Sequence, residues 1–167
     1  MNTKYIPSLF TLANLLMGVL SLIFTMDGQF KRAAVMILLA MVLDGMDGRL
    51  ARRLDATSNF GKELDSLADL VSFGVAPAIL VYAMGIKDLG LAGLALSVAF
   101  ALCGAIRLAR FNTLNISNYF VGVPITAAGS LVALLSLLHN ELPKMAFPII
   151  IVLLSYLMVS NIKVPKY

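Results

Sequence analysis

Long apolar stretches dominate this sequence and constrain its fold more than any other feature. Residues 5–26, 70–86, 89–106 and 145–162 contain no charged side chain. About 20 apolar residues cross the hydrocarbon core of a bilayer as an α-helix. Backbone N–H and C=O groups in lipid must be bonded within the protein, which favours helices over irregular chain. These stretches therefore predict a helical integral membrane protein.

The hydropathy pattern predicts an all-α bundle of six transmembrane helices. Charged residues make up only 13% of the chain, against roughly 25% in soluble domains, so a bilayer must cover the apolar surface. Without a repeat, a low-complexity tract or a long linker, residues 1–167 are expected to form a single domain. The expected helices span residues 6–26, 31–53, 61–85, 90–110, 121–139 and 144–161.

The basic residues predict the orientation of this bundle. With a cytoplasmic N-terminus, nine of the thirteen Lys and Arg residues lie on the inner side of the membrane. Because cytoplasmic loops carry an excess of Lys and Arg, both termini are expected in the cytoplasm. Lys31 and Arg32, in one short outer loop, oppose this bias and are interpreted as headgroup anchors. A net charge of +4 in such a chain does not point to nucleic acid as a partner.

Four aspartates near one end of the second and third predicted helices stand out. Asp44 and Asp47 are three residues apart, and Asp65 and Asp69 are four apart. Both spacings place a pair on one face of a helix. The chain reverses between the pairs, so they can converge at one membrane depth. Ionised carboxylates near lipid are costly, and such residues usually face the bundle interior and have a function.

The aspartate pairs predict a divalent metal centre that binds phosphate. Four like charges in a small volume repel one another unless cations or protons neutralise them. Mg²⁺ prefers oxygen ligands and binds substrate phosphates alongside a few carboxylates. Two metals about 4 Å apart can stabilise both the attacking and the leaving oxygen of a phosphoryl group.

Residues beside the aspartates fit a phosphorylated nucleotide. Gly48, Ala51 and Arg52 fall in the same arc of the second helix as Asp44. The two small residues allow a pyrophosphate to approach the backbone, and Arg52 can bind phosphate oxygens as a bidentate fork. On the third helix Gly61 leaves room opposite Gly48. Ser58 and its neighbours are reasonable N-cap residues for that helix.

The stretch that contains the four aspartates resembles the signature of a known family. The run DGMDGRLARRLDATSNFGKELDSLAD has the form D-x-x-D-G-x-x-A-R-x8-G-x3-D-x3-D, which fixes eight positions in 26 residues. This pattern is similar to the signature of the CDP-alcohol phosphotransferase family at every motif position. The resemblance implies a small protein with six transmembrane helices, usually a homodimer. It also implies transfer of a phosphoalcohol from a CDP-linked donor to an alcohol, with release of CMP.

The resemblance also implies roles for the motif residues. Asp44 and Asp65 would bridge two divalent cations, Mg²⁺ or Mn²⁺, while Asp47 would complete the first metal site and Asp69 the second. Asp69 would also be the catalytic base that takes the proton of the acceptor hydroxyl, for which it must reach that hydroxyl. The residues implied around the CDP-lipid are Gly48, Ala51, Arg52, Ser58 and Gly61.

Later segments resemble one branch of the family. The strings LVSFGVAPA, RLARFN, GVPITAAG and SYLMVSNIKVP are similar to membrane-integral phosphatidylserine synthases of bacteria and archaea. That branch implies a reaction between CDP-diacylglycerol, or an ether-lipid analogue, and L-serine. The products would be phosphatidylserine and CMP, formed in the cell membrane at a site facing the cytoplasm.

Two sets of polar residues have two interpretations each. Arg107, Arg110 and Asn112 of RLARFN can bind the acceptor, or the arginines can simply anchor the helix on the inner side. Thr11 and Asn14, three residues apart on the first helix, can contact the CDP-lipid or make an interhelical hydrogen bond.

Small residues on the third and fourth helices favour either close packing within the chain or a dimer seam: Gly74, Ala76, Ala78, Gly93 and Ala95. Pro124 and Pro148 are expected to kink their helices.

Three other functions compete with serine transfer. The same chemistry can use inositol phosphate or glycerol phosphate as the acceptor, since Arg107 and Arg110 could bind a phosphorylated alcohol. A divalent cation transporter is a more distant alternative, because aspartates within a membrane also mark ion pathways. The four carboxylates lie near one membrane face, however, and their Gly, Ala and Arg neighbours suit a nucleotide better than a bare ion. A silent structural protein is disfavoured because all four carboxylates and Arg52 are present.

Overall fold

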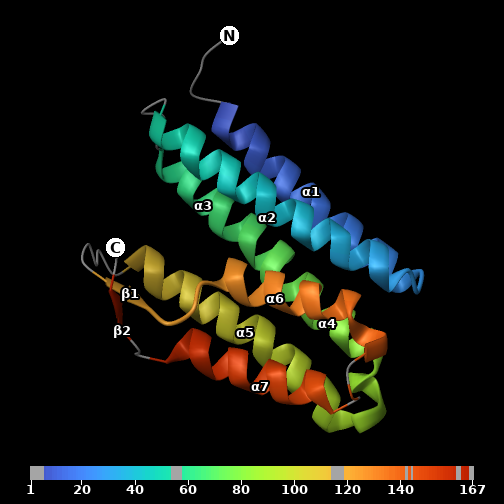
Figure 1. Ribbon diagram of the computed structural model, residues 1–167. Coiled ribbons are helices and arrows are strands. Elements are labelled where there is room, and N and C mark those ends of the chain that lie inside the picture. Colours follow the sequence, from blue (N-terminus) through green and yellow to red (C-terminus); the bar gives the residue numbers. More distant parts are fainter. Residues whose placement is uncertain are drawn as a thin grey trace.

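The computed structural model of the chain contains six long helical stretches, in the order that the sequence predicts (Figure 1). The structure describes the backbone of residues 6–53, 58–113, 119–141, 143, 145–160 and 163–165. Within these ranges it leaves out the side chains of residues 6–8, 47, 50–53, 119–121, 140 and 163–165.

The first three stretches carry the aspartates. Helix α1 covers Ile6–Met26 and α2 covers Phe30–Arg53. The third stretch is continuous but changes its winding: α3 (Asn59–Asp69) leads into a π-helical segment, η2 (Leu70–Val75), and then into α4 (Ala76–Met84). The π-helical segment begins directly after Asp69. Such wide turns are often found at functional sites.

The second half of the chain contains three further helices and two short strands. A 3-10 turn, η3 (Ile86–Leu89), leads into α5, and η4 joins α6 to α7. Strand β1 precedes α6 and pairs antiparallel with β2, Tyr119 opposite Pro165. The bounds are α5 Leu91–Thr113, β1 Tyr119–Val121, α6 Ile125–Leu137, η4 His139–Glu141, α7 Ala146–Val159 and β2 Lys163–Pro165.

Helices α6 and α7 are shorter than predicted, with 13 and 14 residues. Pro124 is the N-cap residue of α6 and Pro148 lies in the first turn of α7. The prediction that these prolines kink their helices was therefore wrong: proline is tolerated at a helix start because the first N–H groups have no intrahelical partner. Part of the segment expected to open the fifth helix, at residue 121, belongs to β1 instead.

The apolar helices are those of an integral membrane protein. Three stretches of the described chain are long and apolar enough to cross a bilayer: Leu9–Met26, Asn59–Met84 and Leu91–Thr113. Helix α2 has 24 residues but carries the charged motif. Helices α6 and α7 fall short of the roughly 20 residues that a perpendicular span requires.

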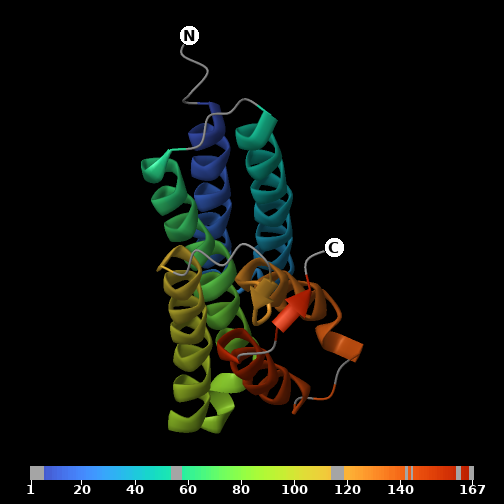
Figure 2. The ribbon, with the colours of Figure 1, turned by 90° about the vertical axis from the view of Figure 1, so that its left-hand side faces the viewer.

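The helices form two groups joined by the third stretch. Helix α1 packs along α2, and both contact the α3–η2–α4 stretch, while α5 packs on α7. Helix α6 lies against α2 and η2. Figure 2 shows the third stretch passing from α1 and α2 toward the opposite end of the molecule, where α5 begins. This arrangement places residues from four helices around the start of η2.

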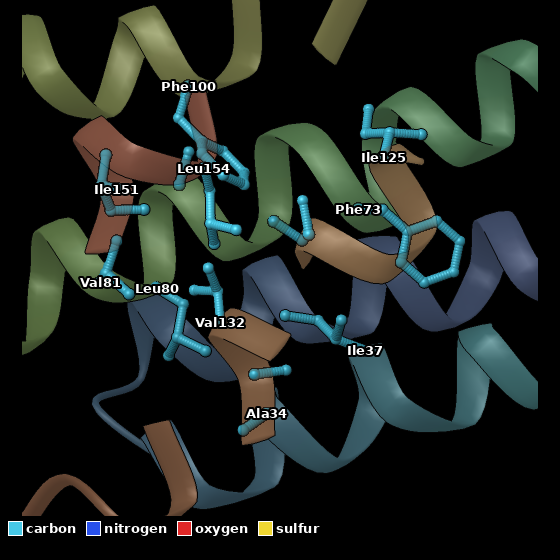
Figure 3. Packing of buried hydrophobic residues seen from close by; sticks show 14 of the residues in the cluster. Ala34, Ile37, Phe73, Leu80, Val81, Phe100, Ile125, Val132, Ile151 and Leu154 are labelled. Atoms are coloured by element: carbon cyan, nitrogen blue, oxygen red, sulfur yellow. The ribbon is translucent and has the colours of Figure 1, made fainter. Parts of the chain in front are cut away.

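Large apolar side chains fill the space between the two groups. Phe73 of η2, Phe100 of α5, Ile125 of α6 and Ile151 of α7 are fully buried. In Figure 3, Phe73 and Ile125 lie on the same side of the view as Ile37 of α2, and Phe100 and Ile151 lie on the other side. Each fully buried side chain of this size contributes about 1.5–3 kcal/mol relative to an exposed one in water. In a bilayer, close packing replaces part of this term because lipid is also apolar.

Small residues allow the helices to approach within this chain. The Cδ1 methyl group of Ile125 lies against both Gly74 of η2 and Gly104 of α5. An added Cβ on Gly93 would collide with the backbone of Ile86. Ala76 and Ala78 are buried, whereas Ala95 is exposed. Of the two uses that the sequence left open, close packing within the chain accounts for all of these residues but Ala95.

Candidate active site

Three carboxylates from two neighbouring helices converge. Asp44 of α2 and Asp65 and Asp69 of α3 each offer one oxygen, and these oxygens lie within 4.8 Å of one another. Asp69 is 8% exposed, and the other two are half-buried. The four-residue spacing on α3 brings Asp65 and Asp69 to one face. Packing of α3 and η2 against α1 and α2 brings that face to Asp44.

The donor set of this cluster fits a hard divalent cation. All three side chains present carboxylate oxygens, which Mg²⁺ and Mn²⁺ prefer in proteins. Carboxylates this close to one another repel, and a cation would remove that repulsion. The side chain of Asp47, the predicted fourth ligand, lies outside the described residues. Its role stays a prediction.

Asn14 connects the first helix to the cluster. Its side chain is fully buried and its Nδ2 donates a hydrogen bond to Asp69 Oδ1 at 3.1 Å. The Asn14 carbonyl oxygen accepts a hydrogen bond from the Ser72 hydroxyl at 3.0 Å. One turn further along α1, Gly18 lies so close to Ser72 that no Cβ would fit. The absence of a side chain at Gly18 therefore lets α1 approach the start of η2.

The bond from Asn14 to Asp69 is the interhelical hydrogen bond that was one of the two interpretations of Asn14. Thr11, one turn earlier on α1, is also buried. Contact of either residue with the CDP-lipid stays a prediction. The position of Asn14 beside Asp69 nevertheless puts this face of α1 next to the carboxylates.

Thr126 is a residue of this site that the sequence analysis did not single out. It lies in the first turn of α6, and its hydroxyl is within hydrogen-bonding reach of the Asp44 carboxylate. Asp44 is also within such reach of Asp69. A single threonine within an apolar segment carries no periodic signal, and its role depends on where α6 begins.

The end of α7 and the segment before α6 fix that beginning. Gly122 has a positive φ of 73° and lies against the carbonyl oxygens of Leu157 and Met158, so a side chain is excluded there. The Val123 N–H donates to Leu157 O at 3.2 Å. These contacts, with the β1–β2 pair, hold the N-terminal end of α6 in place.

The three residues predicted to bind the acceptor occupy different environments. Arg107 of α5 is half-buried and lies close enough to Asp69 for their charges to attract each other. Its guanidinium carbon is 5.6 Å from the centroid of the Phe111 ring. The Nε atom of Arg107 is buried and has no hydrogen-bond partner among the described residues. A buried donor of this kind is costly unless an acceptor completes it.

Arg110 and Asn112 make contacts within the chain. Arg110 is exposed and donates to the carbonyl oxygen of Val159 at 3.0 Å, which ties the end of α5 to the end of α7. Asn112 is exposed and donates to the Ser66 hydroxyl of α3 at 2.9 Å. Of these three residues, Arg107 is the one whose charge reaches the carboxylates.

Of the two glycines in the predicted CDP-lipid pocket, Gly48 leaves room for a ligand, whereas a Cβ on Gly61 would lie 3.1 Å from the Ser58 hydroxyl oxygen. Among the described residues outside its own helical turn, an added Cβ on Gly48 would meet no atom within 4 Å. Ser58 is the N-cap residue of α3, as the sequence predicted, and its hydroxyl accepts a hydrogen bond from the Gly61 N–H at 3.0 Å. The side chains of Ala51 and Arg52 lie outside the described residues, so their part in this pocket stays a prediction.

Fold and site together define an integral membrane protein with a carboxylate centre suited to divalent cations. The chain belongs to the CDP-alcohol phosphatidyltransferase family, whose model matches residues 4–159. Three curated relatives are similar over most of its length. The Helicobacter pylori CDP-diacylglycerol–serine O-phosphatidyltransferase is 43% identical over 96% of this chain and 72% of its own length.

The other two relatives come from a bacterium and an archaeon. A Bacillus subtilis protein of the same name is 38% identical, over 98% of this chain and 92% of its own length. The archaetidylserine synthase of Methanothermobacter thermautotrophicus is 37% identical, over 96% of this chain and 70% of its own length.

Proposed function

We propose that this protein is an enzyme that transfers a phosphatidyl group from CDP-diacylglycerol, or an ether-linked analogue, to L-serine. The products are phosphatidylserine and CMP. Membership of the family supports the CDP-linked donor, and the names of the relatives support serine as the acceptor. The observation that carries the proposal is the convergence of Asp44, Asp65 and Asp69, which gives a CDP-lipid pyrophosphate a place to bind through cations.

In the proposed reaction the serine hydroxyl oxygen attacks the phosphorus attached to the lipid. A new P–O bond forms to serine while the P–O bond to CMP breaks, and CMP leaves with that electron pair. Asp69 takes the hydroxyl proton. Asn14 holds one Asp69 oxygen, Oδ1, in a hydrogen bond, which orients the carboxylate for this task.

Two divalent cations, Mg²⁺ or Mn²⁺, belong to this proposal. Asp44, Asp47, Asp65 and Asp69 would hold them, and Thr126 would orient Asp44. When bound, the cations supply charge that stabilises the pyrophosphate and the leaving phosphate. Gly48, Gly61, Ala51, Arg52 and Ser58 would line the CDP-lipid pocket, with Thr11 and Asn14 on its α1 side.

Arg107 would bind the carboxylate of serine. Its position near Asp69 and its buried Nε, which has no partner among the described residues, support this role. Arg110 and Asn112, both near the end of α5, would support the acceptor pocket through their contacts with α7 and α3. An Arg107→Gln substitution is expected to raise the KM for serine by about tenfold or more, which is a loss of about 1.4 kcal/mol.

Arg110→Gln is the matched control for that prediction. Arg110 is one helical turn further along α5, and it bonds a backbone carbonyl rather than facing Asp69. Its substitution is expected to change the KM for serine far less. Equal effects of the two substitutions on the KM would contradict the assignment of Arg107.

The cellular arrangement is part of the same proposal. Residues 1–167 would form one domain with six membrane-spanning helices, the shorter α6 and α7 included, and two chains would form a homodimer. The excess of basic residues near the carboxylate end supports cytoplasmic termini and an active site open to the cytoplasm. Cysteine accessibility labelling from each side of intact cells would test this orientation.

The decisive experiment supplies the purified protein with CDP-diacylglycerol, Mg²⁺ or Mn²⁺, and a panel of alcohols. CMP release and the lipid product are measured by mass spectrometry for L-serine, inositol phosphate, glycerol phosphate and water. Release of CMP with serine, together with phosphatidylserine, is the expected result. Release only with a phosphorylated alcohol would replace serine as the acceptor, and metal flux without CMP release would favour the transporter.

A further inference from the structure

A cavity with several basic residues in its lining lies at the end of the bundle away from the carboxylates. It has a volume of about 350 Å³ and is formed where three helix connections meet. The α1–α2 connection contributes residues 28–32, the end of α4 contributes Met84, and the end of α6 with η4 contributes Ser136, Leu137 and His139. Arg32 and Asp44 are 12 residues apart on α2, so about 18 Å of helix axis separates the cavity from the carboxylates.

The charged lining of this cavity is basic. Lys31 and Arg32 supply two positive charges, and the His139 imidazole supplies a further donor. No carboxylate is among the described lining residues, and the acidic neighbours in sequence, Asp27 and Glu141, are exposed. The bulk composition gave no hint of this cavity, because its residues come from three separate parts of the chain.

Two of the basic side chains are held in place. The Arg32 guanidinium donates a hydrogen bond to Gln29 Oε1, and Gln29 itself lines the cavity. The His139 ring is tilted against the buried Phe147 of α7, with ring centroids 6.2 Å apart. These contacts reduce the conformational freedom that the side chains would lose on binding an anion.

The start of α2 adds to the basic character. The first N–H groups of a helix have no intrahelical partner and carry partial positive charge. At α2 these belong to Phe30, Lys31 and Arg32, all of which line the cavity. A helix of 24 residues that begins at two cationic side chains is well suited to a phosphate group.

Most of the remaining lining is apolar and comes from Phe30, Met84 and Leu137. A phospholipid satisfies both parts of such a cavity, since its phosphate meets the cations while its glycerol and first methylene groups meet the apolar residues. We infer that this cavity binds the phosphate headgroup of an anionic phospholipid in the leaflet opposite the carboxylate centre. This site is separate from the proposed reaction and does not depend on it.

The test uses the full-length protein, delipidated in a neutral detergent, with phosphatidylglycerol as the probe and phosphatidylcholine as the comparison. Thermal unfolding and native mass spectrometry measure stabilisation and the number of lipids retained. Phosphatidylglycerol is expected to stabilise the wild-type protein more than phosphatidylcholine. In the variant Lys31→Gln/Arg32→Gln we expect binding to weaken by about tenfold, with one fewer phosphatidylglycerol retained.

Lys87→Gln is the matched control, because Lys87 lies in η3 at the same end of the molecule but not in the cavity lining. It should respond to phosphatidylglycerol as the wild type does. Asp44→Asn should also keep this response, which separates the cavity from the carboxylate centre. If the double variant does not fold, His139→Gln replaces it, with a smaller loss of binding expected.

Three results would overturn the inference. The first is an unchanged phosphatidylglycerol response in the cavity variants. The second is an equal loss in Lys87→Gln, which would make the effect one of general surface charge. The third is equal stabilisation of the wild type by inorganic phosphate, which would make the ligand a free anion rather than a lipid.

Discussion

The Asp69 carboxylate is bounded by polar groups from three other helices. Asn14 of α1 donates to it, Asp44 of α2 lies within hydrogen-bonding reach, and the positive charge of Arg107 on α5 acts on it. Its orientation therefore depends on residues far from it in sequence. A carboxylate held in this way can keep one oxygen directed at a ligand without losing side-chain entropy on binding.

Thr126 is expected to tune the metal affinity of the carboxylate centre. In Thr126→Val the hydroxyl beside Asp44 is replaced by a methyl group of similar size. Removing a partner that orients a metal-binding carboxylate typically costs 10–100-fold in affinity, so we expect a loss of about tenfold or more. Titration of the purified protein with Mn²⁺, followed by electron paramagnetic resonance without substrate, measures it.

Thr126→Ser serves as the control because it keeps the hydroxyl. This variant should bind Mn²⁺ within a few-fold of the wild type. An Mn²⁺ affinity that is unchanged in Thr126→Val would show that the threonine only packs in α6.

Gly48→Ala separates ligand binding from folding. The added methyl group meets no described atom outside its own helical turn within 4 Å, so the fold should tolerate it, and alanine is the better helix former by about 1 kcal/mol. If the CDP-lipid approaches this backbone, the methyl group occupies its space. We expect an unchanged or raised melting temperature and an increase in the KM for CDP-diacylglycerol of about tenfold, or about 1.4 kcal/mol.

Gly85→Ala provides the comparison. Gly85 also has open space around it, its φ is that of extended backbone, and it lies at the end of α4, far from the carboxylates. Neither its melting temperature nor its KM should change appreciably. A normal KM for Gly48→Ala would place the CDP-lipid elsewhere.

The sequence predicted some residues of the site but not others. The convergence of Asp44, Asp65 and Asp69 could be predicted because helical spacing is local and the intervening reversal is short. Thr126 could not be predicted, since its contact with Asp44 depends on the packing of α6 against α2. For the same reason the sequence could not distinguish Arg107 from Arg110, which are three residues apart on α5.

At the scale of elements, the first four helical stretches follow the predicted ranges closely, because uncharged runs ended by charged or Gly residues are strong signals. The π-helical segment Leu70–Val75 left no such signal, since winding depends on packing rather than hydropathy. The pairing of β1 with β2 was also not predicted. Each strand has three residues and they lie more than forty positions apart.

Glycines set the distance between the central elements, and two of them should respond differently to alanine. A Cβ on Gly129 of α6 would collide with the backbone of Phe73, which cannot rotate away. A Cβ on Gly104 would instead meet the end of the Ile125 side chain. We expect Gly129→Ala to lower the unfolding free energy by about 1–3 kcal/mol, and Gly104→Ala to lower it less.

Thermal unfolding in detergent compares the two variants. Adding Ile125→Val to Gly104→Ala removes the methyl group in conflict and should recover part of the lost stability, whereas Ile125→Val should not rescue Gly129→Ala. If both glycine variants are as stable as the wild type, the helices are less closely packed than the structure indicates.

At the scale of the whole molecule, the bundle holds two local clusters of opposite charge near its two ends. The carboxylates Asp44, Asp65 and Asp69 lie together near one end, and Lys31, Arg32 and His139 line a cavity at the other. Repulsion among the clustered carboxylates lowers the stability of the folded protein unless a cation offsets it. The folded protein and the divalent cation should therefore stabilise each other, which links metal binding to unfolding of the entire bundle.

This linkage predicts that the effect of Asp44→Asn on stability changes sign with metal. With a chelator present, the wild type contains three clustered carboxylates, so removing one charge should leave the melting temperature equal or raise it. With Mg²⁺ or Mn²⁺ at about 100 times its dissociation constant, binding stabilises the wild type by about 2.7 kcal/mol. The variant binds the cation more weakly and should then melt below the wild type.

Asp27→Asn is the control for this change of sign, because Asp27 is an exposed aspartate outside the carboxylate cluster. Its melting temperature should follow that of the wild type with and without metal. Differential scanning fluorimetry over a titration of Mg²⁺ and Mn²⁺ measures all three proteins together. Parallel curves for Asp44→Asn and the wild type would mean that the cation stabilises the bundle from a different site, and the carboxylate cluster would then lose its assignment as the metal centre.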